Sequence, residues 1–232
     1  VLSDGTVLGQ KLATGNFVER KAPLVRNLLR MRIGTAEVTV ADGTDAYGPE
    51  ITRAVRAFVS VLPNACFIID RATTAVPTTL RSHFAANNRD NRLSVNRADD
   101  HRLVFRRNGE AMKLFECAAW LDGQRTPSAL RLDWGYVHDC YHPLPNQEGQ
   151  GKEGSALIYS WDSPACGTEH LRVYAMAMDA DPAIRSWHIK PEEAGGFRIE
   201  SPDKAPVLRI RVRETDGAVF LVDSRGETLL IS

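Results

Sequence analysis

Three side chains that could bind a metal ion lie at alternate positions in the segment that begins at His138, continues through Cys140 and ends at His142. On an extended strand, residues two apart point to the same side, so these three would share one face. Imidazole and thiolate ligands suit zinc or copper, and Cys166 and His170 follow as further candidate ligands. The spacing matches no zinc finger, and the proline that follows favours a loop with surface histidines as the alternative.

His83 is a second candidate, because it and Arg81 are predicted to lie on one face of the strand Thr78–Phe84. An imidazole beside a guanidinium can bind an anion, and the imidazole can also ligate a metal such as zinc. A histidine that only makes a hydrogen bond at the rim of a sheet is the alternative interpretation.

Arginine dominates the basic residues, since 23 of the 29 are arginines and 6 are lysines. Arginine gives planar, two-pronged contacts to carboxylate, sulfate or phosphate, although genomic base composition also explains such a bias. Arg209, Arg211 and Arg213 alternate along one predicted strand. They form either a stripe for a polyanion or the solvent-exposed face of an outer strand, where acidic neighbours pair with them.

The most apolar part of the chain is the pair of runs Arg53–Val61 and Ala65–Ile69, which the turn at Pro63-Asn64 folds into a hairpin. Alternation puts the valines of the first run on one face, whereas Cys66–Ile69 is apolar on both faces. A strand that is apolar on both faces is predicted to be central, between two layers. Five polar residues then lie near the sheet rim: Tyr47, Arg53, Arg56, Asp70 and Arg71.

The 232 residues are 43% hydrophobic and carry 29 basic and 29 acidic side chains, which is ordinary globular composition without a gross attraction to nucleic acid. No apolar run approaches the ~18–20 residues that span a bilayer. The sequence contains none of the nucleophile-elbow, phosphate-loop, dinucleotide-binding, zinc-protease or EF-hand motifs. The first residues, VLSDGTVLGQ, lack Met and a charged signal region, so we expect a mature or excised fragment.

Period-two alternation recurs along the chain and predicts an all-β fold, a large antiparallel β-sandwich of about 12–16 strands in two or more stacked sheets. The sequence is interpreted as one domain over residues 1–232, with Pro143–Gly154 as a long surface loop. Asn108-Gly109 is the strongest hairpin signal, and the last 30 residues are predicted to form a three-stranded meander. Only Pro23–Met31 is predicted to form a short helix.

The segment VTVADGTDAYGPEITRAVRAFVSVLPNACFIIDRATTAVPTTLRSHF, residues 38–84, resembles the β-sandwich region of heparinase II/III-like polysaccharide lyases. It has an Asp followed by Ala-Tyr (Asp42 to Tyr47), an arginine-flanked strand, an apolar strand ending in Asp-Arg, and then a strand containing His83. EGSALIYSWD and EHLRVYAMAMD look like later strands of that region. The similarity extends over residues 5–232.

The resemblance implies the C-terminal β-sandwich of a longer, bacterial, periplasmic or secreted enzyme, whose N-terminal α/α toroid is absent here. Such lyases cleave uronic-acid-containing polysaccharides, such as glycosaminoglycans or alginate, by β-elimination, and a Tyr or His abstracts the C5 proton. The family's sandwich often holds zinc between histidines and an aspartate, and His83 matches the position of one ligand. The histidine-rich segment that usually opens this region is missing, because His83 is the first histidine of the chain.

Three functions follow as hypotheses. The first is a lyase module, inactive without its helical domain, that binds an anionic polysaccharide. Its expected binding residues are Tyr47, Arg53, Arg56, Arg71, Arg81 and His83. The second is a carbohydrate-binding sandwich without catalysis, in which Trp134, Tyr136, Tyr141 or Trp187 stack on sugars. The third is a metal-binding sandwich that uses His138, Cys140 and His142, with Cys166 or His170.

Overall fold

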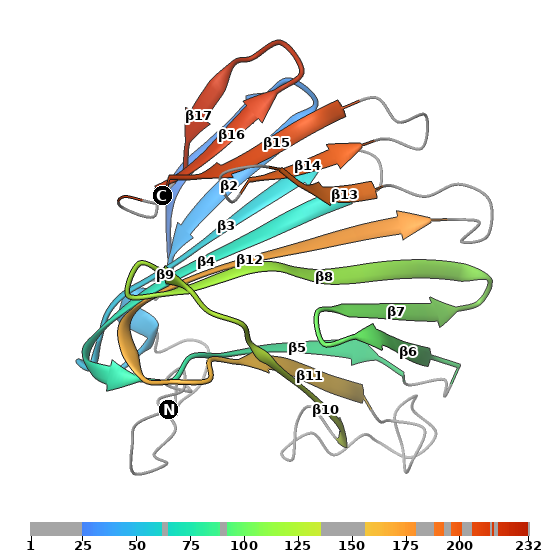
Figure 1. Ribbon diagram of the computed structural model, residues 1–232, viewed down its shortest axis with the longest axis horizontal. Helices are drawn as coiled ribbons and strands as arrows, with labels where there is room; N and C mark the ends of the chain where they lie inside the picture. The colour runs from blue at the N-terminus through green and yellow to red at the C-terminus, as the bar shows by residue number, and fades with distance from the viewer. Residues whose placement is uncertain are drawn as a thin grey trace, which may run out of the picture.

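Three stacked antiparallel sheets make up the described part of the chain (Figure 1). The computed structural model describes residues 25–61, 65–88, 92–135, 156–179, 188–192, 196–200, 206–213, 215 and 218–231. These residues form seventeen strands and one three-residue 3-10 helix, η2 (Thr44–Ala46). The all-β sandwich predicted from the sequence is therefore confirmed, with one strand more than the upper expectation.

The central sheet contains nine strands, and β4 and β12 lie in its middle. Its order is β1 (Arg26–Ile33), β2 (Ala36–Asp42), β3 (Ile51–Val61), β4 (Ala65–Thr78), β12 (Gly167–Asp179), β8 (Glu110–Leu121), β7 (Arg102–Arg107) and β6 (Ser94–Asp99), with β9 (Gln124–Arg125) paired to β8. Because β12 pairs with both β4 and β8, strands that are distant in sequence close the middle of this sheet.

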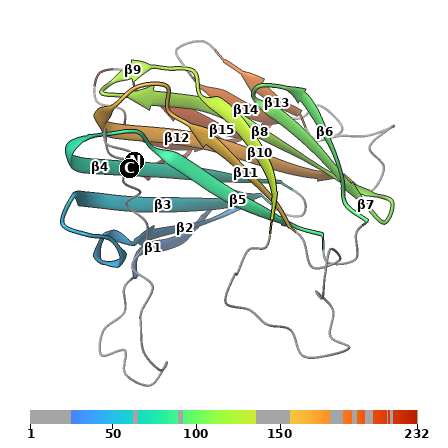
Figure 2. The ribbon, with the colours of Figure 1, turned by 90° about the horizontal axis from the view of Figure 1, so that it is seen from below.

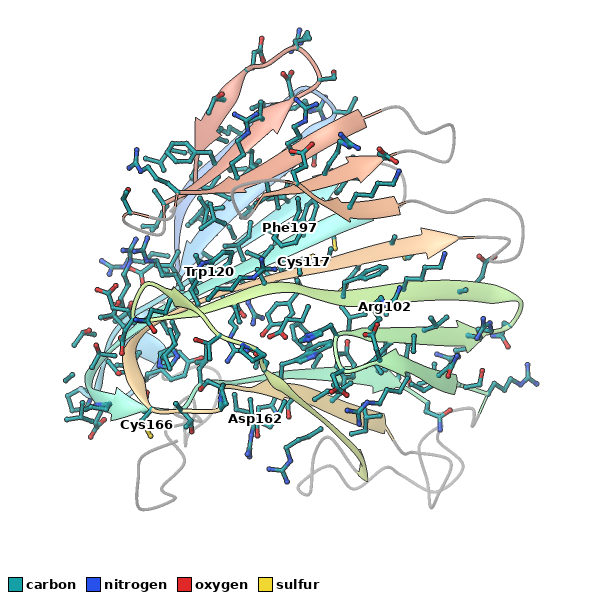
Figure 3. The ribbon with its side chains drawn as sticks, in the orientation of Figure 1. Arg102, Cys117, Trp120, Asp162, Cys166 and Phe197 are labelled. Atoms are coloured by element: carbon teal, nitrogen blue, oxygen red, sulfur yellow. The ribbon has the colours of Figure 1, made fainter. Side chains whose placement is uncertain are left out.

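The upper sheet of Figure 1 covers one face of the central sheet. It is a meander in chain order of β13 (His188–Pro191), β14 (Phe197–Glu200), β15 (Pro206–Val212), β16 (Val219–Asp223) and β17 (Thr228–Leu230). Apolar residues of the upper and central sheets form one buried cluster, which includes Phe197 of β14 and Trp120 of β8; Figure 3 labels both. The predicted three-stranded meander of the last residues is confirmed as β15 to β17.

The lower sheet covers part of the opposite face, and its strands cross the central sheet at an angle (Figures 1 and 2). It consists of β10 (Ala129–Gly135), β11 (Ala156–Asp162) and β5 (Arg81–Asn87). Its inward rings, Tyr159 and Trp161, belong to a second buried cluster with Ile68 and Tyr174 of the central sheet. Two separate apolar interfaces therefore hold the three layers together.

The central position of the FIID segment is confirmed. Phe67 and Ile69 of β4 are buried in the cluster beneath the upper sheet, whereas Ile68 is buried in the cluster above the lower sheet. Alternate side chains of one strand enter both interfaces because β4 has a layer on each side. Burying each of these side chains contributes about 1.5–3 kcal/mol, so this strand is a large part of the core.

The Asn108-Gly109 turn connects β7 to β8 as predicted. Its φ angles of 53° and 86° are both positive, which is the geometry that a type I′ turn requires. Asparagine and glycine adopt such angles at low cost, so this pair fixes the hairpin register in which Arg107 faces Glu110.

Two local predictions are wrong. Pro23–Met31 was predicted to contain a helix, but residues from Arg26 onward form β1, which pairs with β2. A short apolar run carries too little periodicity to separate helix from strand, and pairing with β2 decides the outcome. The single strand predicted over Thr78–Phe84 is divided, because the chain leaves the central sheet after Thr78 and enters the lower sheet at Arg81.

Gly34, in the turn between β1 and β2, lies close to the upper sheet. Its φ is +55°, and a Cβ atom there would lie 3.1 Å from the Asp223 Cβ and Oδ2 atoms. The Asp223 carboxylate is fixed, since it accepts hydrogen bonds from the backbone N–H groups of Arg225 (2.9 Å) and Glu227 (2.8 Å). The turn therefore has neither the backbone geometry nor the space for a side chain.

We expect Gly34→Ala to lower the free energy of unfolding by about 1–2 kcal/mol, from the left-handed conformation and the close contact together. Urea unfolding followed by circular dichroism measures the change. Thr35→Ala in the same turn is the control and should stay within about 0.5 kcal/mol. Equal midpoints for the two variants would contradict this explanation.

Candidate functional site

Charged side chains gather on the outer face of the lower sheet. Arg81 and His83 of β5, Ser160 and Asp162 of β11, and Arg131 of β10 are adjacent across the strands. The register places His83 opposite Ser160, which lies opposite Arg131 in turn. We call these five residues the lower-sheet cluster; Figure 3 labels Asp162 within it. The predicted sharing of one face by Arg81 and His83 is confirmed, because Ser82 between them points inward and is buried.

Asp162 is the centre of the lower-sheet cluster. Arg81 donates two hydrogen bonds to its carboxylate, from Nε at 2.8 Å and from Nη2 at 2.7 Å. Arg131 Nη1 lies 3.6 Å from the same carboxylate, and Ser160 Oγ donates to it at 3.4 Å. The two-pronged contact fixes the Arg81 guanidinium, whereas the Arg131 side chain is 63% exposed and has N–H groups to spare.

The electrostatics of the lower-sheet cluster keep His83 neutral near pH 7. Partial burial lowers the pKa of His83 below its usual 6.5, and the positive charges of Arg81 and Arg131 lower it further against the opposing effect of Asp162. Burial raises the pKa of Asp162, but hydrogen bonding from Arg81 and the two positive charges outweigh this, so the pKa is lowered. The described charges of the cluster therefore sum to +1, with an uncharged imidazole between two arginines.

A second polar group lies on the face of the central sheet that looks toward the lower sheet. Arg56 of β3 donates from Nε (2.6 Å) and Nη2 (2.7 Å) to the two carboxylate oxygens of Asp70 on β4. The Arg56 guanidinium lies 5.9 Å from the ring centres of both Phe58 and Phe84. Tyr47 follows η2 directly in the chain.

Arg53 and Arg71 do not join this group. Arg56 pairs in register with Asp70, whereas Arg71 pairs with Val55, whose side chain is in the upper interface. Alternation therefore directs Arg71 to the opposite face of the sheet from Arg56. Arg53 is exposed and lies two residues before Val55 in the same register, so alternation directs it to the same face as Arg71. The structure therefore does not bring together the six residues predicted to bind polysaccharide. Arg81 lies beside His83 on the lower sheet, Arg56 lies beside Asp70 on the central sheet, and Arg53 and Arg71 point to the opposite face from Arg56.

Between the two sheets lies a buried ion pair that the sequence interpretation missed. Arg172 of β12 donates from Nη1 to Glu116 Oε1 at 2.7 Å, and both side chains are 2% exposed. Arg172 also donates to Ser128, and Glu116 Oε2 lies 3.1 Å from His101 Nδ1. The sequence did contain a signal, since Arg172 is a charged residue within the apolar run LRVYAMAM. Its partner Glu116 could not be identified from the sequence, because it is 56 positions away.

Arg209 and Arg211 of β15, and Arg213 directly after it, lie on the solvent side of the upper sheet, while Ile210 and Val212 are buried. Arg209 Nε is 3.2 Å from Glu192, and the guanidinium of Arg213 lies 5.2 Å from the ring centre of Phe220. For Arg209, this supports the interpretation in which the arginines form a solvent-exposed face and pair with acidic neighbours.

The zinc ligation predicted for His83 stays a prediction. The described residues contain no group of three His, Cys, Asp or Glu side chains close enough to share an ion. His170 is buried and its Nε2 is 3.2 Å from the Gly167 carbonyl oxygen, whereas Cys166 is exposed. The segment with His138, Cys140 and His142 lies outside the described residues, so the third hypothesis stays a prediction. None of the described segments forms a helix able to cross a lipid bilayer.

His170 should make stability depend on pH. Its side chain is buried, its Nδ1 has no hydrogen-bond partner among the described residues, and burial together with the positive charge of Arg172 lowers its pKa despite the bond to Gly167. The folded state therefore binds fewer protons than the unfolded state below about pH 6.5, so stability falls as pH decreases through that value. His83 contributes with the same sign.

We expect the denaturant midpoint to fall between about pH 7.5 and pH 5.5, and to fall less in His170→Gln, which cannot gain the proton. The comparison uses the pH slope of each variant, so a constant cost of the substitution cancels. Gln124→Ala is the control, because Gln124 is exposed and does not titrate. An unchanged slope in His170→Gln would exclude this histidine as the source.

Comparison with solved structures gives matches to heparinases. A mutant of the heparan sulfate lyase HepC from Pedobacter heparinus matches with TM-score 0.53 and 14% identity, over 90% of this chain and 27% of that one. The heparinase III BT4657 gene product matches with TM-score 0.53 and 12% identity, over 81% of this chain and 28% of that one. A further heparinase III structure matches with TM-score 0.51 and 11% identity, over 89% of this chain and 26% of that one.

The chain therefore spans about a quarter of the length of the heparinases it matches, and it shares the fold of that part. No protein-family model matches the sequence, and no curated protein matches it.

Proposed function

We propose, from the fold that this chain shares with part of heparinase III, that it is the β-sandwich module of a lyase that cleaves uronic-acid-containing polysaccharide by β-elimination. The match over 90% of the chain, against 27% of the matched protein, is the observation that carries the proposal. It fits a module that acts together with an N-terminal helical domain, and the enzyme would be periplasmic or secreted like the family it resembles.

The lower-sheet cluster is the proposed binding surface for the anionic polymer. Arg131 is largely exposed and only weakly engaged by Asp162, so its guanidinium can make a two-pronged contact with a uronate carboxylate or a sulfate. Arg81 is more rigid and adds positive potential beside it. Charged hydrogen bonds of this kind contribute about 1.5–3 kcal/mol each.

His83 has the chemistry to accept the C5 proton in such a reaction. β-Elimination removes a proton adjacent to a carboxylate, and arginines that bind the carboxylate stabilise the charge that develops there. A neutral imidazole between Arg81 and Arg131 is a base in the correct protonation state near pH 7. We propose this role for His83 in the full-length enzyme.

The binding surface is tested with heparin and the double variant Arg81→Ala, Arg131→Ala. We expect its Kd for heparin, measured by isothermal titration calorimetry at about 0.1 M salt, to rise tenfold or more, since about 1.4 kcal/mol of lost binding is a factor of ten. Arg125→Ala on β9 is the control, because it removes an exposed arginine elsewhere on the molecule. Equal affinities of the double variant and the control would contradict the assignment.

The catalytic proposal is tested in the full-length protein. His83→Gln should abolish the ultraviolet-absorbing unsaturated product while leaving the Kd for the polymer nearly unchanged. If the parent protein binds the polymer but never produces unsaturated product, the module belongs to a carbohydrate-binding protein without lyase activity, which is the second hypothesis.

A further inference from the structure

Arg56 is held in one orientation by contacts on three sides. Two of its N–H groups bond the Asp70 carboxylate at 2.6 and 2.7 Å, and the guanidinium lies 5.9 Å from the ring centres of Phe58 and Phe84. Distances below about 6 Å are those of favourable cation–π contacts. The two rings come from different sheets, β3 of the central sheet and β5 of the lower sheet, so the arginine lies where the two layers separate.

The held arginine still has donors to offer. A guanidinium carries five N–H groups, and Asp70 accepts from two of them. The Arg56 side chain is 41% exposed, whereas Asp70 is 13% exposed. The carboxylate is therefore the more buried half of the pair, and the partly exposed guanidinium keeps three N–H groups that Asp70 does not use.

Phe58 is unusual for a phenylalanine in the middle of a strand. It is 44% exposed, although its strand neighbours Ala57 and Val59 are buried on the opposite face. The lower-sheet strands β5, β10 and β11 cross the central sheet at an angle (Figure 2), and the exposure of Phe58 shows that they leave its ring accessible to solvent. The ring thus stands on an open sheet face, next to a rigid cation.

We propose that Phe58 and Arg56 form a saccharide-binding subsite, distinct from the lower-sheet cluster. An exposed aromatic ring packs on the apolar C–H face of a pyranose, and a guanidinium beside it bonds a carboxylate or sulfate on that sugar or on the next one. Because Asp70 and Phe84 hold the arginine in advance, little conformational entropy is lost when the sugar binds. This inference rests on the proposed function, and it adds Phe58 as the residue that recognises the pyranose ring of the sugar.

A saccharide fits these observations better than a nucleic acid. The 29 basic and 29 acidic residues of the chain favour neither polyanion by net charge, so the choice of a saccharide rests on the fold shared with a heparan sulfate lyase and heparinases. The Phe58–Arg56 subsite offers one ring and one cation, which suits a chain with one charged group per sugar.

The test measures the binding of three polymers to Phe58→Ala, Phe58→Tyr and the double variant Arg81→Ala, Arg131→Ala. Heparin supplies both rings and charges, polyphosphate supplies charges alone, and oligo(dT) supplies planar bases with charges. We expect Phe58→Ala to weaken heparin binding about tenfold. Its affinity for polyphosphate should stay unchanged, and Phe58→Tyr should keep the affinity of the parent for heparin. Leu230→Ala is the control, since Leu230 is an exposed apolar residue of the upper sheet.

The outcomes separate the two proposals. If the double variant loses heparin but Phe58→Ala binds it like the parent, the cluster stands and the subsite is refuted. An equal loss of oligo(dT) and heparin in Phe58→Ala would overturn the saccharide assignment. If the parent protein does not bind heparin or any uronate polymer, the proposed function fails, and the subsite fails with it.

Discussion

Glu116→Ala lowers the free energy of unfolding by about 3–5 kcal/mol, because it leaves the Arg172 guanidinium buried without its carboxylate. Both side chains are 2% exposed, and the 2.7 Å bond between them joins β12 to β8 on the face of the central sheet that looks toward the lower sheet. Removing one charge from such a pair costs far more than the pair contributes, since the remaining charge stays out of water. Urea unfolding monitored by circular dichroism measures the effect.

Arg97→Ala is the matched control, because Arg97 forms an exposed ion pair with Asp100 and such pairs contribute at most about 1 kcal/mol. The double variant Glu116→Leu, Arg172→Met removes both charges and should recover most of the stability lost in Glu116→Ala. If Glu116→Ala costs no more than Arg97→Ala, the buried pair is not the electrostatic element described here.

Trp161→Ala should destabilise the protein by a similar amount, about 3–5 kcal/mol. Trp161 is fully buried between the lower and central sheets, its ring centre lies 5.4 Å from that of Tyr174, and its Nε1 donates to the Asp100 backbone oxygen at 3.1 Å. The substitution opens a cavity in the smaller interface, where few other large residues hold the three-stranded sheet in place. Because domains are stable by only about 5–15 kcal/mol, this is a large fraction of the total.

Trp161→Phe separates the two contributions, since it keeps a ring but loses the hydrogen bond, and it should cost less than Trp161→Ala. Leu132→Ala on the same sheet is the control and should stay within about 1 kcal/mol, because Leu132 is 39% exposed. Far-ultraviolet circular dichroism is the readout, so that loss of the tryptophan does not alter the signal. A Trp161→Ala midpoint equal to that of Leu132→Ala would refute the role of this ring.

Local signals in the sequence were sufficient for most of the fold. Alternation located the strands, Asn108-Gly109 located a hairpin, and the doubly apolar Cys66–Ile69 located the central strand, because each of these depends on neighbours in the chain. The same reasoning failed at β1, where Leu29 packs with Val40 of β2 and that pairing outweighs a weak local pattern. Alternation also could not show that the chain leaves the central sheet after Thr78 and enters the lower sheet at Arg81.

The candidate sites were predicted only in part, for the same physical reason. Alternation correctly paired Arg81 with His83, but Arg131 and Asp162 join them through a register between distant strands that no local pattern encodes. Sugar-stacking aromatics were expected at Trp134, Tyr136, Tyr141 and Trp187, whose side chains lie outside the described residues. The exposed ring that the structure describes is Phe58, which the sequence presented as an ordinary member of an apolar run.

The order of strands in the central sheet has a consequence for how the protein folds. β4 ends at Thr78, yet its second neighbour, β12, begins only at Gly167, and β12 also provides the missing neighbour of β8. During synthesis, the hairpins β3–β4 and β7–β8 emerge early and each exposes an unpaired inner edge until β12 arrives. Such loop closure is slow, and open edges attract other chains, so chaperone protection is most needed in the interval before residue 179 is made.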